Sequence, residues 1–336
     1  MTKLWFMTAV VFIAAQSFGS QLINGAGATF PYPIYSKWFS EYQKVKPDVT
    51  INYQSIGSGG GIKQLIGKTV DFGASDAPMT EEELGQANPK VLHIPTVLGA
   101  VVVSFNVAGV SELNLTSEVI SDIFLGKITQ WNDPKIQALN PKSKLPEKLS
   151  IMAVHRSDGS GTTSVFTDYL AKTNAEWKTK VGAGKAVQWP KGIGVGGKGN
   201  EGVAGLLKQH PGSIGYVELV YAESNKLSQA AVKNKAGQFV KASMESVSAA
   251  ASGSLKNIPA DYRISITEAD GAKSYPISSF TYILVYESMA KDKGQSLVEF
   301  LNWAMGPGQK MATSLSYAPL PDSLVTKVKK TITQIK

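Results

Sequence analysis

Apolar and polar positions follow two different periods along this chain of 336 residues, and each period predicts a different kind of element. Short apolar runs rich in β-branched residues predict strands at 49–53, 99–105, 150–154, 214–217 and 281–285. Between these runs, apolar residues that recur every three or four positions predict helices at 34–45, 62–66, 81–86, 117–124, 164–169, 203–209 and 297–305. This alternation predicts an α/β protein with a mostly parallel sheet, and apolar strands such as 99–105 fit a sheet covered on both faces.

The beginning of the chain has the pattern of a secretory signal peptide. Lys3 precedes an uncharged apolar run at 4–15, and small residues follow at Ser17, Gly19 and Ser20. We therefore expect residues 1–20 to be a signal peptide that is cleaved on secretion. The alternative is an uncleaved membrane anchor, but the apolar run is short for spanning a bilayer. No cysteine lies near the cleavage region, which excludes a lipid-anchored lipoprotein.

Composition narrows the classes of function. The chain contains no cysteine, which excludes disulfides, thiolate metal sites and cysteine catalysis. The formal net charge is +8, but the lysines are spread along the chain. A nucleic-acid-binding protein usually concentrates its basic residues, so we expect no nucleic-acid partner. A diffuse positive charge suits capture of a small anion or simple solubility, and charge alone does not choose between them.

Three segments rich in Gly, Ser and Thr each precede a predicted helix, at 25–30, 57–61 and 158–163. The first turn of a helix carries unpaired N–H groups and the positive end of the helix dipole, so it attracts anions. Glycine lets the backbone approach an anion closely, and the hydroxyls of Thr29, Ser58, Ser160 and Thr162 add donors. For any single loop, ordinary helix capping is the simpler explanation. Three loops of the same design favour an anion site.

Two further positions bring charge to these loops. Arg156 stands just before the third loop, and a guanidinium can bind an oxyanion through two parallel hydrogen bonds while Asp158 holds it in place. An alternative is a surface arginine beside a turn-forming aspartate. Asp76 follows a short apolar segment, where it is either a helix cap or a hydrogen-bond acceptor for the anion. A carboxylate beside an anion is unfavourable unless the anion carries a proton, so Asp76 would favour phosphate over fully ionised sulfate.

The sequence resembles periplasmic phosphate-binding proteins of the phosphate ABC transporter, over nearly the whole length that follows residue 20. The motifs that carry the resemblance are GAGATFPYPIYSKW, YQSIGSGGGIKQ, TVDFGASDAPM, HRSDGSGTTSVF, WPKGIGVGGKGNEGVAG, GSIGYVE and SYAPLPDSLV. The resemblance implies a two-lobed α/β fold of the periplasmic-binding-protein type with crossover hinge strands. It places lobe 1 at 21–95 plus 276–336 and lobe 2 at 96–275.

The resemblance also implies a function and a site. The function is that of a monomeric, high-affinity periplasmic receptor for inorganic phosphate that delivers it to the membrane permease subunits of an ABC importer. The implied phosphate ligands are Thr29, Phe30 through its backbone N–H, Ser58, Asp76, Arg156, Ser160, Gly161 and Thr162. Asp158 pairs with the arginine and reduces its net attraction for divalent anions. Two positions depart from the family pattern. Gly59 stands where a serine is frequent. His155 stands where some members have a second arginine, so it would lower the local positive field and give binding a weak pH dependence.

Other readings are weaker. Residues 192–197 match a dinucleotide-binding pattern and approach a P-loop, but Gly199 stands where a P-loop needs Ser or Thr, so we expect a flexible glycine loop without a nucleotide. The three histidines lack metal-ligand spacing, and Ser58 lacks the full nucleophile-elbow pattern, so we expect no metal, no cofactor and no enzymatic activity. The alternatives that remain are a receptor for another oxyanion, such as sulfate or molybdate, and a secreted phosphoesterase.

Overall fold

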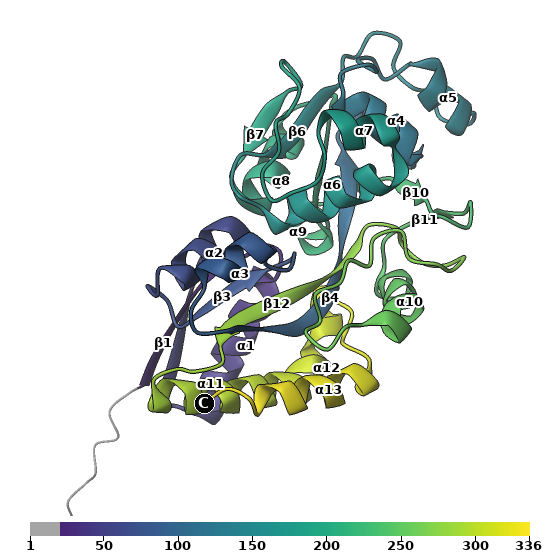
Figure 1. Cartoon of the computed structure of the whole chain (residues 1–336). Helices are drawn as coiled ribbons and strands as arrows, with labels where there is room; N and C mark the ends of the chain where they lie inside the picture. Colours follow the sequence, from purple (N-terminus) through teal and green to yellow (C-terminus); the bar gives the residue numbers. More distant parts are fainter. Residues whose placement is uncertain (1–20) are drawn as a thin grey trace, which may run out of the picture.

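A single mixed sheet forms the centre of the molecule (Figure 1). The computed structural model describes residues 21–336, so the signal peptide expected at 1–20 lies outside the described residues. Within that range the strand order is β2-β1-β3-β12-β4-β8-β6-β7, with β9 beside β4. The strands are β1 (Gln21–Gly27), β2 (Val49–Ser55), β3 (Phe72–Ser75), β4 (Val91–Phe105), β6 (Met152–Arg156), β7 (Val195–Gly197), β8 (Ser213–Glu218), β9 (Ser228–Gln229) and β12 (Ser278–Tyr286).

The expectation of a mostly parallel sheet is wrong. β1 pairs in parallel with β2 and β3, and β6 pairs in parallel with β7 and β8. In the centre, however, β12 runs antiparallel to β3 and β4, and β4 runs antiparallel to β8 and β9. The reason is the route of the chain: β4 leaves the first group of parallel strands for the second, and β12 returns.

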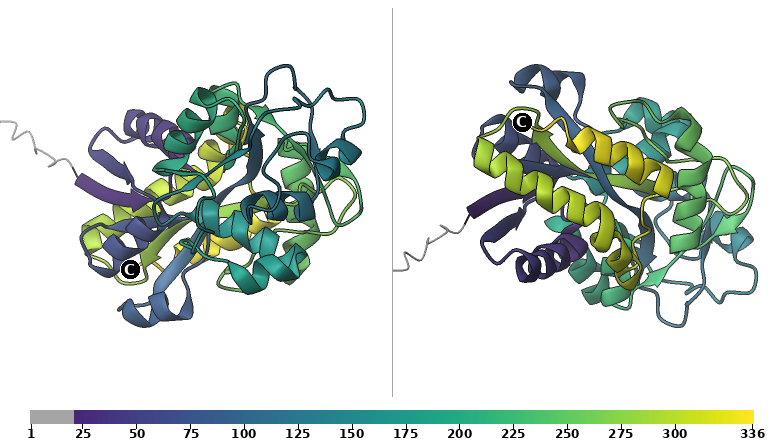
Figure 2. Two further views of the ribbon diagram at one scale, coloured as in Figure 1. Left: turned by 90° about the horizontal axis from the view of Figure 1, so that it is seen from above. Right: turned by 90° about the horizontal axis from the view of Figure 1, so that it is seen from below.

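Helices cover both faces of this sheet. They are α1 (Tyr32–Val45), α2 (Ser58–Ile66), α3 (Glu81–Gln86), α4 (Ser117–Phe124), α5 (Pro134–Leu139), α6 (Gly161–Thr173), α7 (Ala175–Lys180), α8 (Gly199–Gln209), α9 (Leu219–Ser224), α10 (Met244–Ser254), α11 (Lys291–Trp303), α12 (Gln309–Ala312) and α13 (Asp322–Ile332). Seen from below, α11 and α13 lie side by side across one face (Figure 2). A small separate sheet joins β5 (Asn114–Leu115), β10 (Ala231–Lys233) and β11 (Phe239–Val240).

β4 links the two lobes of this α/β fold. Its 15 residues are all buried. The first part of the strand pairs with β12, and residues Val101–Phe105 pair with β8 of the other lobe. In Figure 1 the lobe with β6, β7 and α4–α8 lies above the lobe with β1–β3 and α1–α3. The two-lobed fold with crossover strands is therefore confirmed.

The pairing of β4 with β12 contains one irregularity. The register shifts between Thr281 and Tyr282, whose partners are Val97 and Pro95. Pro95 has no N–H to give to the ladder, so a bulge is a natural place for it. Between these partners, Thr96 Oγ1 donates to the Thr281 carbonyl oxygen at 3.1 Å. A side-chain hydroxyl bond thus joins the crossover strands at the place where their regular pairing is interrupted.

Candidate functional site

The carboxyl ends of the parallel strands in both lobes meet at one cleft. β1 and β3 end at Gly27 and Ser75, and β6 ends at Arg156. In open α/β sheets, ligands bind at this edge of the strands. Helices α2 and α6 begin directly beyond it, and the lobes touch there, because the Gly59 N–H donates to the Gly159 carbonyl oxygen at 2.9 Å.

The structure brings the predicted site residues together in this cleft. The side chains of Thr29, Phe30, Ser58, Asp76, Arg156, Ser160 and Thr162 come from both lobes, and each residue is at most 3 % exposed. Gly161 is buried with them at the start of α6. The first turns of α2 and α6, which carry backbone N–H groups without a partner inside the helix, therefore lie in this buried region.

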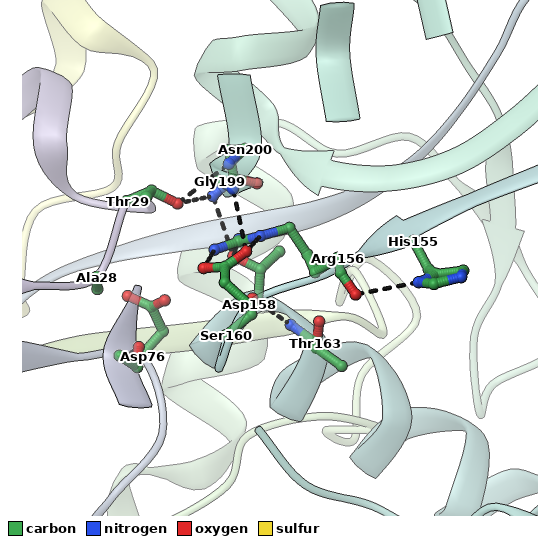
Figure 3. Close-up of polar contacts among 12 residues, drawn as sticks. Ala28, Thr29, Asp76, His155, Arg156, Asp158, Ser160, Thr163, Gly199 and Asn200 are labelled. Atoms are coloured by element: carbon green, nitrogen blue, oxygen red, sulfur yellow. Dashed lines mark hydrogen bonds and ion pairs between the residues drawn. The ribbon is translucent and has the colours of Figure 1, made fainter. Parts of the chain in front are cut away.

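Arg156 is held by a carboxylate beside it (Figure 3). Its Nε donates to Asp158 Oδ1 at 2.8 Å and its Nη2 donates to Asp158 Oδ2 at 2.6 Å. Asp158 Oδ1 also accepts from the Gly199 N–H at 3.0 Å. Partial burial raises the pKa of Asp158, but the hydrogen bonds and charge of Arg156 outweigh it, so this pKa lies below its ordinary value. The ionised Asp158 fixes the guanidinium and offsets part of its charge.

Asp76 is a carboxylic acid in a dry environment. Its Oδ1 accepts from Thr281 Oγ1 at 2.8 Å, and its backbone N–H donates to Ser58 Oγ at 3.3 Å. Burial raises the pKa of Asp76 to about 7, although Thr281, Arg156 and Ser58 each act in the opposite direction. The group therefore changes its protonation state near neutral pH, and when ionised it is a hydrogen-bond acceptor facing an array of donors.

At the start of α6, Ser160 caps the helix and Gly161 occupies a position where a side chain would not fit. Ser160 Oγ accepts from the Thr163 N–H at 3.0 Å, so it is an N-cap, and its own proton is left for another acceptor. A Cβ atom at Gly161 would lie 2.4 Å from both Asp76 Oδ2 and Ser58 Oγ, which belong to the other lobe. Only glycine fits there while the lobes are in contact.

The site is thus rich in donors and poor in acceptors, which suits a tetrahedral oxyanion that still carries a proton. Residues 21–336 contain no group of three or more histidine, aspartate or glutamate side chains placed to hold a metal ion. Over the same residues, no helix is long and apolar enough to cross a membrane.

Residues 14–307 match the family model described as the PBP superfamily domain. The chain is 46 % identical over 332 residues to the phosphate-binding protein PstS of Pasteurella multocida, covering 98 % of this chain and 95 % of that one. The chain belongs to the PstS family of the PBP superfamily. A second PstS, from Haemophilus influenzae, is 47 % identical over 91 % of each chain. Among solved structures, a high-affinity periplasmic phosphate-binding protein (PfluDING) with bound phosphate has the same fold, with a TM-score of 0.72 at 23 % identity over 92 % of this chain and 93 % of that one.

In this PstS-family chain, the glycine segment at 192–197 is a loop only over its first half, and the expectation of a loop is corrected for the second half. Val195–Gly197 forms β7, which pairs in parallel with β6 and leads into α8 at Gly199. Directly after Gly199, Asn200 is fully buried in the cleft. The segment belongs both to a nucleotide-like pattern and to the motif WPKGIGVGGKGNEGVAG, but neither of them singles out Asn200. The informative pattern was a fourth glycine-rich turn entering a helix, like the three loops already singled out.

A second expectation concerned His155. Its ring stacks on Trp189 with 4.6 Å between ring centroids, and Nδ1 lies 3.0 Å from the Arg156 carbonyl oxygen. In Figure 3 the ring points away from Asp76 and the guanidinium. Burial lowers the pKa of His155, so the ring is neutral at pH 7. A neutral ring where some relatives carry a second arginine agrees with the expected lower positive field, whereas nothing in its position supports the expected pH dependence of binding.

Proposed function

We propose that this protein is a periplasmic receptor that binds inorganic phosphate between its two lobes and delivers it to the membrane permease subunits of a phosphate ABC importer. It acts as a monomer and carries out no catalysis. The observation that carries the proposal is the pairing of one buried carboxylate, Asp76, with an array of donors from both lobes. Phosphate matches this array because it presents acceptor oxygens and one proton.

We assign the phosphate contacts from the positions of the residues in the cleft. The proposed contacts are the Thr29 hydroxyl, the Phe30 N–H, the Ser58 hydroxyl, the Asp76 carboxylate, the Arg156 guanidinium, the Ser160 hydroxyl, the Gly161 N–H, and the Thr162 N–H and hydroxyl. Asp158 supports Arg156 through its two hydrogen bonds. The negative charge is then balanced mainly by oriented dipoles and one partly neutralised guanidinium.

Lobe 1 is proposed to comprise 21–95 and 276–336, and lobe 2 to comprise 96–275. The first boundary falls inside β4, near Pro95, and the second precedes β12. Movement of the lobes about these crossovers would admit phosphate, and closure would bury it. No observation on the described residues favours a sulfate receptor, a molybdate receptor or a phosphoesterase over this function.

Equilibrium dialysis of labelled phosphate against the purified protein tests the proposal. We expect saturable binding at one site at pH 8, unaffected by a large excess of sulfate. Asp76→Asn is the matched variant: its amide can donate to a protonless oxyanion, so sulfate should now compete. Sulfate competition with the unchanged protein would discard the phosphate assignment, and an absence of phosphate binding would discard the receptor.

A further inference from the structure

Asn200 joins hydroxyls of the two lobes, although nothing in the function above requires it to touch the anion. Its Nδ2 donates to Thr29 Oγ1 at 2.8 Å and to Thr162 Oγ1 at 3.1 Å. Its backbone N–H also donates to Thr29 Oγ1, at 3.2 Å. All three residues are at most 2 % exposed, so water does not compete for these bonds.

The orientation of the Asn200 amide is fixed from behind. Its Oδ1 accepts from the Glu218 backbone N–H at 2.9 Å. A backbone N–H can only donate, so it must face the amide oxygen, and the NH₂ group must face the two threonines. Glu218 ends β8 and caps α9, which ties this contact to rigid elements.

The consequence concerns the direction of two hydroxyl protons. A hydroxyl oxygen has two acceptor positions and one proton. Thr29 Oγ1 accepts twice from Asn200, and Thr162 Oγ1 accepts once from Asn200 and once from Arg156 Nη1 at 3.4 Å. With the acceptor positions filled, each hydroxyl has only its proton left to offer.

We propose that Asn200 is a positioning residue that makes Thr29 and Thr162 obligatory donors to the anion. This inference rests on the proposed function. The amide acts before binding, because it removes orientations in which a hydroxyl would present a lone pair to the negative oxygens. Such preorganised donors cost no reorientation when the anion arrives.

A double-mutant cycle on phosphate affinity tests this role, using Asn200→Ala, the pair Thr29→Val with Thr162→Val, and all three changes together. We expect Asn200→Ala to weaken binding about tenfold, and the valine pair to weaken it on the order of a hundredfold or more. In the valine background, Asn200→Ala should cost less than about twofold, because there are no hydroxyls left to orient. Asn140→Ala, which removes a buried amide elsewhere in the upper lobe, should leave the affinity unchanged.

A residue that only braces the lobes would weaken binding equally in both backgrounds, and that additive result would overturn the inference. An unchanged affinity of Asn200→Ala would overturn it as well. Thermal unfolding checks that each variant is folded. If Asn200→Ala does not fold, Asn200→Asp has nearly the same shape but accepts from the hydroxyls, and it should bind at least about a hundredfold more weakly; wild-type affinity in that variant would refute the role. Failure of the unchanged protein to bind phosphate would instead refute the proposed function itself.

Discussion

At the scale of single residues, Asp76 shows a conflict between folding and binding. The fold holds this carboxyl in a dry site, where burial favours the neutral form. Recognition of a protonated oxyanion requires the ionised form, which can accept a hydrogen bond. The pKa of about 7 places Asp76 between these two demands.

Replacing Asp76 with asparagine should therefore stabilise the ligand-free protein at high pH. The pKa of Asp76 rises from 3.8 to about 7 on folding, so the folded protein binds this proton more tightly than the unfolded chain, and stability falls as pH rises between these values. Above pH 7 the full cost is present, and Asp76→Asn should raise the free energy of unfolding by up to about 4 kcal/mol, since one pKa unit is worth about 1.4 kcal/mol.

Urea unfolding at pH 8, 6 and 4.5 in anion-free buffer measures this difference, which should shrink as the pH falls. Glu112→Gln is the control, because the side chain of Glu112 is 81 % exposed and should not alter the unfolding transition. A gain for Asp76→Asn that stays constant across the pH range would contradict the shifted pKa.

At the scale of elements, the sequence was most informative about periodicity and least informative about helix starts. The predicted helices at 81–86 and 117–124 agree with α3 and α4, and a capping threonine stands directly before each of them. Helices α2, α6 and α8 begin earlier than predicted, since glycines assigned to loops form their first turns. Glycine is a poor helix former, and close approaches explain its use there: a Cβ atom at Gly61 would lie 2.4 Å from Gly27 Cα in the same lobe, and one at Gly161 would lie 2.4 Å from Asp76 Oδ2 in the other lobe.

The sequence predicted part of the candidate site and missed another part. Residues inside distinctive local motifs, such as Asp76 and Arg156, could be found from the sequence, and the structure places them together. The role of Asn200 could not be found from the sequence. It depends on hydrogen bonds to Thr29 and Thr162, which are 171 and 38 positions away along the chain. No local pattern encodes such long-range contacts.

The glutamate of the α3 capping box also forms an ion pair with a lysine of the opposite lobe. Glu83 Oε2 accepts from the Thr80 N–H at 2.8 Å, which completes the capping box of α3, and from Lys185 Nζ at 2.9 Å. The Lys185 and Glu83 side chains are only 13 % and 24 % exposed, so this ion pair is less screened than a surface pair. It forms only where the lobes meet and should favour the closed arrangement.

Lys185→Gln should weaken phosphate binding by roughly three- to tenfold, because a charge-assisted bond of the closed form is lost. Lys37→Gln is a matched control: it breaks a pair with Glu41 on the exposed surface of α1 and should leave the affinity unchanged. Isothermal titration calorimetry compares the two variants. Equal affinities would show that the pair does not contribute to closure.

At the scale of the whole molecule, the two lobes approach so closely that glycine is required between them. Gly161→Ala should lower phosphate affinity on the order of a hundredfold, because the new Cβ would overlap Asp76 and Ser58 and hold the lobes apart. Calorimetry gives the affinity, and small-angle X-ray scattering should show a more open particle in the presence of phosphate. Gly205→Ala in α8, whose Cβ would meet nothing within 4 Å, should behave like the unchanged protein. Tight binding by Gly161→Ala would mean that the lobes need not meet at this point.

The bulge between β4 and β12 connects the anion site to the bending of the molecule. Thr281 donates its hydroxyl to Asp76, and its carbonyl oxygen accepts from Thr96 across the bulge. Coupling free energies are reciprocal: if binding at Asp76 favours one curvature of the crossover, then imposing the other curvature must weaken binding by the same factor. A transport partner that binds the outer surfaces of both lobes and changes the curvature at this bulge would therefore lower the affinity for the anion. No atom of the partner would have to enter the cleft.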